Sequence, residues 1–186
     1  MAPPDRVTVL LEGASDVAAV RALAVAAGVD LDLVRLVDLG GVTNVERALT
    51  GLDQQHPGGE VVGLCDAAEA GVVVKALRRR GLFLRDADDL PSYGFFVCVA
   101  DLEDELIRAL GADRAVAVIE RVGLGGKLTT LRGQLAWRDR PLLEQLRRFC
   151  GVASGRKELL AAAFAESLDA DAVPEPLRML LDRLPR

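Results

Sequence analysis

Acidic side chains follow three apolar runs of this chain at the point where each run ends. Short apolar runs of this kind are typical of strands buried on both faces of a parallel sheet, and ligands of such sheets bind at the carboxyl ends of the strands. Carboxylates gathered there repel one another unless a proton or a cation intervenes, and a hard divalent cation prefers oxygen ligands. The clusters are Glu12 and Asp16 after residues 7–11, Asp66 and Glu69 after residues 61–65, and Asp101, Glu103, Asp104 and Glu105 after residues 95–100.

Helix capping is the alternative explanation of each cluster. Ser15 could cap a helix over residues 16–27, and Asp66 as N-cap with Glu69 at the third helical position resembles an acidic capping box. Acids near a helix N-terminus are favourable without any function. Capping must explain part of the segment 101–105, since its four acids cannot all face one ion. The coincidence of three clusters at one sheet edge nevertheless favours a metal site.

Alternating strand and helix signals in residues 1–111 predict an α/β fold, a parallel sheet of about four strands flanked by helices with right-handed crossovers. Beyond Gly111 only helical periodicity is found, so residues 112–186 are predicted to form an all-helical C-terminal extension packed on the sheet. The expected strands are 7–11, 33–38, 61–65 and 94–99; the expected helices are 16–27, 43–50, 68–80, 101–110, 113–121, 127–137, 141–149, 156–168 and 175–184.

The net charge of −5 is unevenly distributed along the 186 residues. Residues 1–120 hold 11 basic and 20 acidic side chains, a net of −9, whereas residues 121–160 hold 9 and 3, a net of +6. The balance argues against bulk affinity for nucleic acid, while the basic segment permits local phosphate contacts. The same segment is also explained by solvated helix faces.

Cysteine usage and hydropathy favour a cytoplasmic protein. Three cysteines cannot all pair within one chain, and we expect them to be reduced. The N-terminal residues lack the basic and apolar pattern of a signal peptide, and no apolar run approaches the roughly 18 residues of a membrane span.

Several common catalytic motifs are excluded by the residues present. The segment Gly123-Leu124-Gly125-Gly126-Lys127 fails as a phosphate loop, because Arg121 stands where glycine is needed and Leu128 where serine or threonine is needed. His56 is the only histidine, so neither a Ser/His/Asp set nor a zinc site with Cys/His spacing can be defended.

The motif Glu12-Gly13-x-Ser15-Asp16 after an apolar strand resembles the first motif of TOPRIM domains, the catalytic fold of topoisomerases, primases and related nucleases. Asp66 is similar to the first position of that family's Asp-x-Asp motif. The element Asp101-Leu102-Glu103 and the tail with Gly155-Arg156-Lys157 resemble the nuclease branch named for the overcoming-lysogenization-defect (OLD) proteins. The resemblance covers nearly the whole chain.

The resemblance implies roles for individual residues. Glu12 would be a metal ligand or general base, and Lys157, carried by the helical extension, would stabilise charge on a phosphate that Arg156 also contacts. The implied metal ligands are Glu12, Asp16, Asp66, Glu69, Asp101 and Glu103, holding two Mg²⁺ or Mn²⁺ ions.

The resulting hypothesis is a metal-dependent phosphodiester nuclease, or nucleotidyl transferase or hydrolase, that acts on DNA. Ala68 stands where the family has its second aspartate, and no ATPase domain of the OLD type is present in this sequence. A separately encoded ATPase partner is therefore one expectation. The alternative is a catalytically degenerate TOPRIM module that binds metal, phosphate or such a partner without turnover. A small-molecule phosphatase or kinase-like protein is a third reading.

Overall fold

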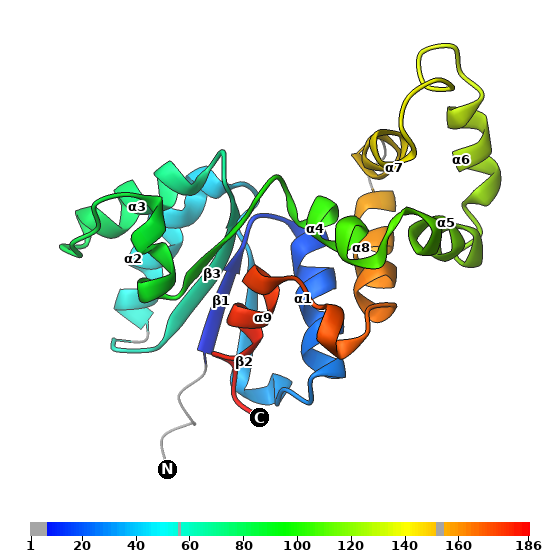
Figure 1. Ribbon diagram of the computed structural model, residues 1–186. Helices are drawn as coiled ribbons and strands as arrows, with labels where there is room; N and C mark the ends of the chain where they lie inside the picture. The colour runs from blue at the N-terminus through cyan, green and yellow to red at the C-terminus, as the bar shows by residue number, and fades with distance from the viewer. Residues whose placement is uncertain (1–6, 56, 152–154) are drawn as a thin grey trace.

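The computed structural model describes residues 7–55, 57–151 and 155–186. Its centre is a four-stranded parallel sheet in the order β2-β1-β3-β4 (Figure 1). The predicted α/β class and the four strands are confirmed. The strands are β1 (Val7–Leu11), β2 (Val34–Asp38), β3 (Val61–Asp66) and β4 (Phe95–Cys98).

Helices cover both faces of the sheet, because the residues of each strand alternate between two separate cores. Val9 and Leu11 of β1 belong to the larger core, whereas Leu10 belongs to the smaller one. The larger core is closed by α1 (Ala14–Ala26) and by helices of the second half of the chain, and the smaller core by α2 (Val45–Gln55) and α3 (Ala70–Arg79). Figure 1 shows these two layers on opposite sides of the strands.

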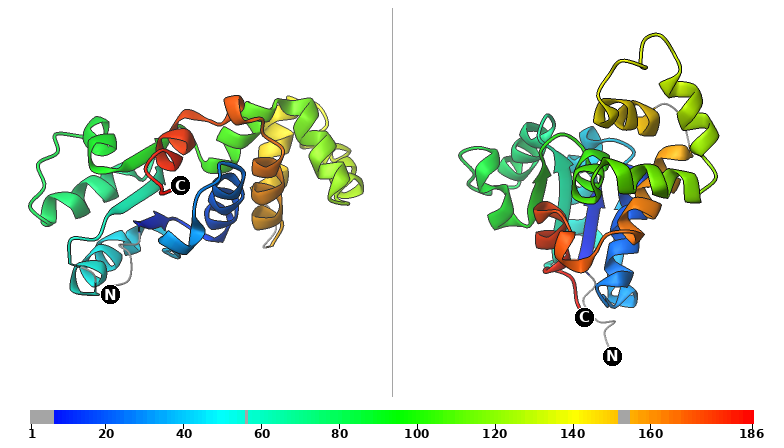
Figure 2. Two further views of the ribbon diagram at one scale, coloured as in Figure 1. Left: turned by 90° about the horizontal axis from the view of Figure 1, so that it is seen from below. Right: turned by 45° about the vertical axis from the view of Figure 1, so that its right-hand side comes forward.

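Beyond Gly111 the described residues form helices joined by turns, and no strand is found among them. Helix α8 packs along α1, and α9 lies against β3 and β4 (Figures 1 and 2). The division at residue 111 stays a prediction, since apolar side chains from both halves share the larger core. The helices are α4 (Leu102–Leu110), α5 (Ala112–Arg121), α6 (Gly125–Arg132), α7 (Leu142–Gly151), α8 (Arg156–Glu166) and α9 (Glu175–Leu181).

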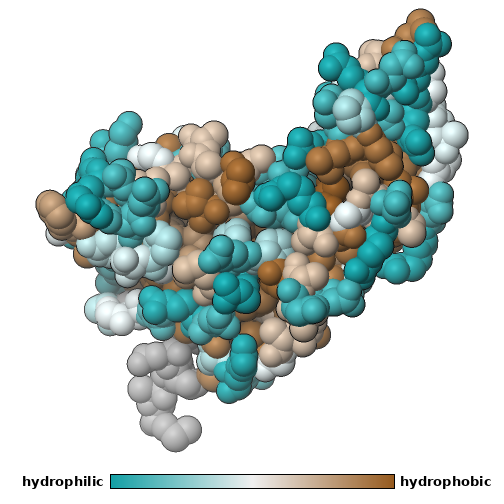
Figure 3. Space-filling view, viewed as in Figure 1, coloured by the Kyte–Doolittle hydropathy of each residue, from teal (hydrophilic) through white to brown (hydrophobic). Residues whose placement is uncertain are grey.

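Helices α5, α6 and α7 form a lobe at the end of the molecule, with apolar side chains gathered in its hollow (Figures 1 and 3). Trp137, Leu142 and Leu143 are partly buried there against the larger core. No helix in the described ranges is long and apolar enough to cross a membrane.

Three local expectations about helix ends are wrong. Helix α1 begins after Gly13 rather than after Ser15, and Ser15 is buried in its first turn. Asp66 is the last residue of β3, and Glu69 rather than Asp66 is the N-cap of α3. The helix expected over 127–137 ends at Arg132 and is followed by turns. His56 lies outside the described residues.

Gly63 in β3 is required by close packing between the central strands. A Cβ atom built at this position would lie 2.7 and 2.8 Å from two ring atoms of Phe95 and 3.0 Å from the carbonyl oxygen of Leu10. Phe95 is itself 3% exposed, so its ring has little room to move. A side chain at residue 63 would therefore overpack the smaller core.

We expect Gly63→Ala to lower the free energy of unfolding by about 1–3 kcal/mol through overpacking. Gly51→Ala in α2 is the matched control, because a Cβ atom there meets nothing within 4 Å. That change should be stabilising by about 0.5–1 kcal/mol, since alanine is the better helix former. Urea unfolding monitored by circular dichroism measures both, and equal stability of the two variants would contradict the packing assigned to Gly63.

Candidate metal centre

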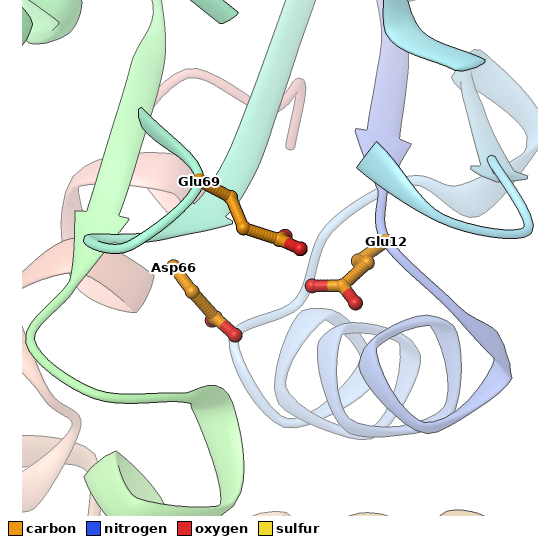
Figure 4. A group of neighbouring side chains, drawn as sticks. All are labelled: Glu12, Asp66 and Glu69. Atoms are coloured by element: carbon orange, nitrogen blue, oxygen red, sulfur yellow. The ribbon is translucent and has the colours of Figure 1, made fainter. Parts of the chain in front are cut away.

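Three carboxylates from separate segments converge at the carboxyl edge of the sheet. Glu12 follows β1, Asp66 ends β3, and Glu69 lies in the turn between β3 and α3. One oxygen from each of the three lies within 4.8 Å of the other two. Figure 4 shows the side chains pointing toward one another. No other group of three possible ligands this close is found in the described part of the chain.

Capping does not explain the Glu69 carboxylate. Although Glu69 occupies the N-cap of α3, its side chain makes no capping hydrogen bond. Its Oε2 atom is buried and has no hydrogen-bond partner. Burying an unpartnered carboxylate oxygen is costly, so this atom calls for a proton or a cation. The donor set fits a hard divalent ion, because all three ligands are carboxylate oxygens.

The electrostatics of the cluster favour a bound cation. Burial, and then the neighbouring Glu69 carboxylate, raise the pKa of Glu12. Burial, followed by the charges of Glu12 and Asp16, raises the pKa of Asp66 to about 7. Holding these side chains ionised together is unfavourable without a compensating charge.

A second group of charged side chains lies beside the triad of Glu12, Asp66 and Glu69. It contains two carboxylates, Asp16 in α1 and Glu103 in α4, and the ammonium group of Lys157 in α8. The Lys157 Nζ atom lies 3.3 Å from Glu103 Oε2, and Glu103 is 4% exposed. Neither carboxylate oxygen of Glu103 has a hydrogen-bond partner of good geometry. Burial raises the pKa of Glu103, while the Lys157 charge opposes this.

Charge balance within this second group keeps Lys157 cationic. Partial burial would lower the lysine pKa, but Glu103, Asp16 and Asp101 together raise it. Burial and the Glu103 charge raise the pKa of Asp16 to about 6. The Lys157 side chain is 48% exposed, so its ammonium group lies at the edge of the acidic site.

Asp16 and Asp101 also have local structural roles. The Asp16 carboxylate accepts the backbone N–H groups of Glu12 at 3.1 Å and Gly13 at 3.3 Å, which fixes the turn that presents Glu12. Asp101 caps α4 by accepting the Asp104 N–H at 2.7 Å. Both residues lie outside the convergent triad, although the Asp101 charge contributes to the raised pKa of Glu12 and of Asp66.

The remaining acids of the segment 101–105 are structural. Asp104 is buried and pairs with Arg108 and with Arg147. Glu105 accepts the Val99 N–H at 2.8 Å and pairs with Arg108 at 2.7 Å. Within this segment, therefore, only Asp101 and Glu103 can bind a metal ion without breaking an ion pair to arginine.

The basic residues expected to meet phosphate are partly engaged within the protein. The Arg156 guanidinium lies 4.4 Å from the centre of the Phe149 ring and donates to the Phe149 carbonyl at 3.3 Å. Arg148 stacks over Trp137 at 5.7 Å. Of the two phosphate-binding candidates, Lys157 is the one that lies beside the carboxylates.

The chain shares its fold with C-terminal regions of OLD proteins. The Xanthomonas campestris pv. campestris OLD C-terminal region is 23% identical with a TM-score of 0.66, and the match covers 97% of this chain and 92% of that one. The Burkholderia pseudomallei OLD C-terminal region is 22% identical with a TM-score of 0.63, and 97% of each chain is covered. A further X. campestris structure is 26% identical with the same TM-score of 0.66, covering 96% and 93%.

No protein-family model matches the chain, and no curated protein sequence matches it significantly. The resemblance drawn from the Glu-Gly-x-Ser-Asp motif is confirmed at the level of the fold. The catalytic and ligand roles of individual residues stay predictions.

The raised pKa of Asp66 predicts a pH-dependent stability in metal-free protein. A carboxyl whose pKa is higher in the folded than in the unfolded state binds more protons when folded, so stability falls as pH rises from about 4 to about 7. Asp66→Asn should flatten this dependence and add on the order of 1 kcal/mol at about pH 8, a value reduced for solvent screening.

Urea unfolding in EDTA at about pH 5 and about pH 8 measures this difference. Asp113→Asn, at an exposed acid in the first turn of α5, is the control and should leave the wild-type dependence unchanged. An unaltered pH dependence in Asp66→Asn would contradict the electrostatics assigned to the cluster.

Proposed function

We propose that this protein is a metal-dependent nuclease, or nucleotidyl transferase or hydrolase, that cuts or rejoins phosphodiester bonds of DNA. The observation that carries the proposal is the buried, unpartnered Glu69 oxygen facing Glu12 and Asp66 at the carboxyl edge of a fold shared with OLD C-terminal regions. A carboxylate cluster of this composition has no evident structural role without a cation.

Glu12, Asp66 and Glu69 would hold one Mg²⁺ or Mn²⁺ ion, and Asp16, Asp101 and Glu103 a second. Ions bound there would offset the carboxylate charge that otherwise repels phosphate, activate water and stabilise the leaving oxygen. Glu12, whose pKa is raised by burial and by the neighbouring Glu69 carboxylate, would accept the proton of an attacking water.

Lys157 would stabilise charge on the phosphate. It is cationic, half exposed and 3.3 Å from Glu103, so its ammonium group already lies over the second carboxylate group. A positive group that is already in place stabilises the transition state most where negative charge develops on the phosphate. Its pairing with Glu103 holds it in place before substrate binds.

The surrounding charge supports a polyanionic substrate bound by its backbone. Residues 121–160 carry a net charge of +6. Where it is described, this range includes the last residue of α5, helices α6 and α7 and the start of α8, which carries Lys157 beside the carboxylates. Backbone contacts position a nucleic acid without reading its sequence, so we expect weak sequence preference. A separately encoded ATPase remains our proposal for a partner.

A catalytically silent module is the second candidate, and Ala68 at the second aspartate position is the observation that favours it. Such a module would bind metal, phosphate or the partner without turnover. Lys157 separates the two candidates: a catalytic lysine is needed for cleavage while contributing little to metal affinity.

Purified protein should nick supercoiled plasmid with Mg²⁺ or Mn²⁺ and lose this activity in EDTA. Glu12→Ala should reduce the rate by at least about 10²-fold by removing a ligand or base, and Lys157→Ala by about 10²–10³-fold by removing a charge-stabilising donor. Gel electrophoresis of the plasmid forms measures both rates.

Lys75→Ala, at an exposed lysine of α3 outside the basic segment, is the control and should cleave at the wild-type rate. Cleavage by Glu12→Ala at the wild-type rate would show that the site is wrong. Absence of cleavage with either metal, together with intact metal binding, would favour the silent module.

Metal binding itself predicts a gain in stability that depends on Glu69. At about 100 times its dissociation constant, Mn²⁺ should add about 2.7 kcal/mol to the free energy of unfolding of the wild type. Glu69→Gln should lose most of this gain, and Glu158→Gln, at an exposed acid of α8, should keep it. Thermal unfolding with Mn²⁺ and with EDTA tests the triad independently of catalysis, and an equal gain in the two variants would refute it.

A further inference from the structure

A pocket of about 290 Å³ lies between β2 and α2, on the sheet face that carries the smaller core. Its apolar lining comprises the partly exposed Val37, Leu39 and Ala48 and the buried Leu10 and Leu52, and polar side chains of both elements surround them. Its volume is at the lower end of the range for small-ligand sites, which are about 300–1,000 Å³. The space is therefore suited to one planar ring system rather than to a larger ligand.

Two arginines line this pocket without a carboxylate partner. Arg35 projects from β2 and Arg47 from α2, and neither makes an ion pair within the described ranges. By contrast, Arg79 and Arg80 of the neighbouring α3 are paired with Glu46 and Asp53. Free guanidinium groups beside an apolar surface favour an anionic ligand with an apolar face.

Asp38 is the one acidic residue of the lining, and it is already engaged. Its Oδ1 atom accepts the Gly40 N–H at 2.7 Å. The lining therefore has two positive charges and one negative charge. This balance favours a phosphate-bearing ligand over a cation.

The pocket is connected to the carboxylate triad by the segment 39–44. Leu39 and Asn44 line the pocket, and the Asn44 side chain donates to the Leu39 carbonyl at 2.9 Å. Gly41 in the same segment donates its N–H to the Glu12 carbonyl at 2.9 Å. Figure 4 shows the ribbon that follows β2 passing beside Glu12. The two sites thus adjoin one short, hydrogen-bonded turn.

We propose that this pocket holds one nucleotide of the DNA strand, next to the phosphodiester bond that faces the triad. This proposal rests on the proposed function. The base would lie on the partly exposed side chains of Val37, Leu39 and Ala48, and its phosphate would meet Arg35 and Arg47. Nonpolar contact with a base face is tolerant of sequence, whereas the two guanidinium groups require a phosphate. The pocket is a binding subsite and takes no part in the chemistry.

Affinity for DNA can be measured without catalysis by fluorescence anisotropy of a short single-stranded oligodeoxynucleotide in EDTA. The double variant Arg35→Ala/Arg47→Ala should bind at least about 10-fold more weakly, and the slope of log affinity against log salt should fall by about 0.7, the value for one phosphate contact on a single strand. Arg21→Ala, an exposed arginine of α1 on the other sheet face, should change neither quantity.

Gly51 allows the pocket to be filled while both arginines remain. A Cβ atom at Gly51 meets nothing within 4 Å and the residue lines the pocket. Gly51→Phe should therefore weaken oligonucleotide binding to a similar extent, whereas Gln54→Phe, at an exposed residue of α2 outside the pocket lining, should bind like the wild type. Circular dichroism establishes that each variant is folded before its affinity is compared.

Unchanged affinity in both the double arginine variant and Gly51→Phe would overturn the subsite, even if the wild type nicks plasmid as proposed. Loss of affinity in both, with normal binding by Arg21→Ala and Gln54→Phe, would support it, even if no nicking is found. A third arm uses adenosine monophosphate in place of the oligonucleotide. Arginine-dependent binding of that nucleotide, with oligonucleotide affinity unchanged, would overturn the placement of a DNA strand and assign a free nucleotide instead.

Discussion

Mutual repulsion among carboxylates is the constraint around which this structure is arranged. Parallel strands bring every strand end to one edge, and here Glu12, Asp66 and Glu69 meet there within 4.8 Å. Burial makes the ionised carboxylates less favourable and so raises the pKa of Glu12 and of Asp66. Arginines do not neutralise these carboxylates within the described residues. Arginines are present nearby, but Arg108 and Arg147 are assigned to Asp104 and Glu105. The pairing thus separates structural acids from those left free for a cation.

The helical half of the chain completes this electrostatic arrangement. Helix α8 packs along α1 and also contacts α4, which carries Glu103, and these contacts set Lys157 beside Glu103. The lysine is therefore positioned by a hydrophobic interface and not by the carboxylates alone. Burial of Leu160 and Phe164 on α8, both at 0% exposure, holds the ammonium group at the edge of the acidic site. The buried apolar side chains of α8 thus position Lys157, and its ammonium group supplies the charge.

Periodicity in the sequence was sufficient for the fold, because apolar runs of β-branched residues and helical spacing report burial directly. It was insufficient for helix caps, because the position of a cap depends on the residue at which the preceding strand ends. Ser15 and Asp66 have the residue types of N-caps, yet the strands β1 and β3 end so that Gly13 and Glu69 take those places. The clustering of Glu12 with Asp66 was predicted because both follow strands whose carboxyl ends share one edge of a parallel sheet. The pocket with Arg35 and Arg47 could not be predicted, since solvated arginines have no distinctive sequence signal.

The departure at Ala68 has a geometric answer in the turn that joins β3 to α3. Residues 67–69 form this turn, in which Ala67 and Ala68 are exposed and Glu69 is half-buried with its Oε2 atom enclosed. A carboxylate at residue 68 would start from an exposed position of this turn, while residue 69 is directed back toward Glu12. Glu69 therefore brings the third carboxylate of the cluster from the position after Ala68, on a side chain one methylene longer than that of aspartate.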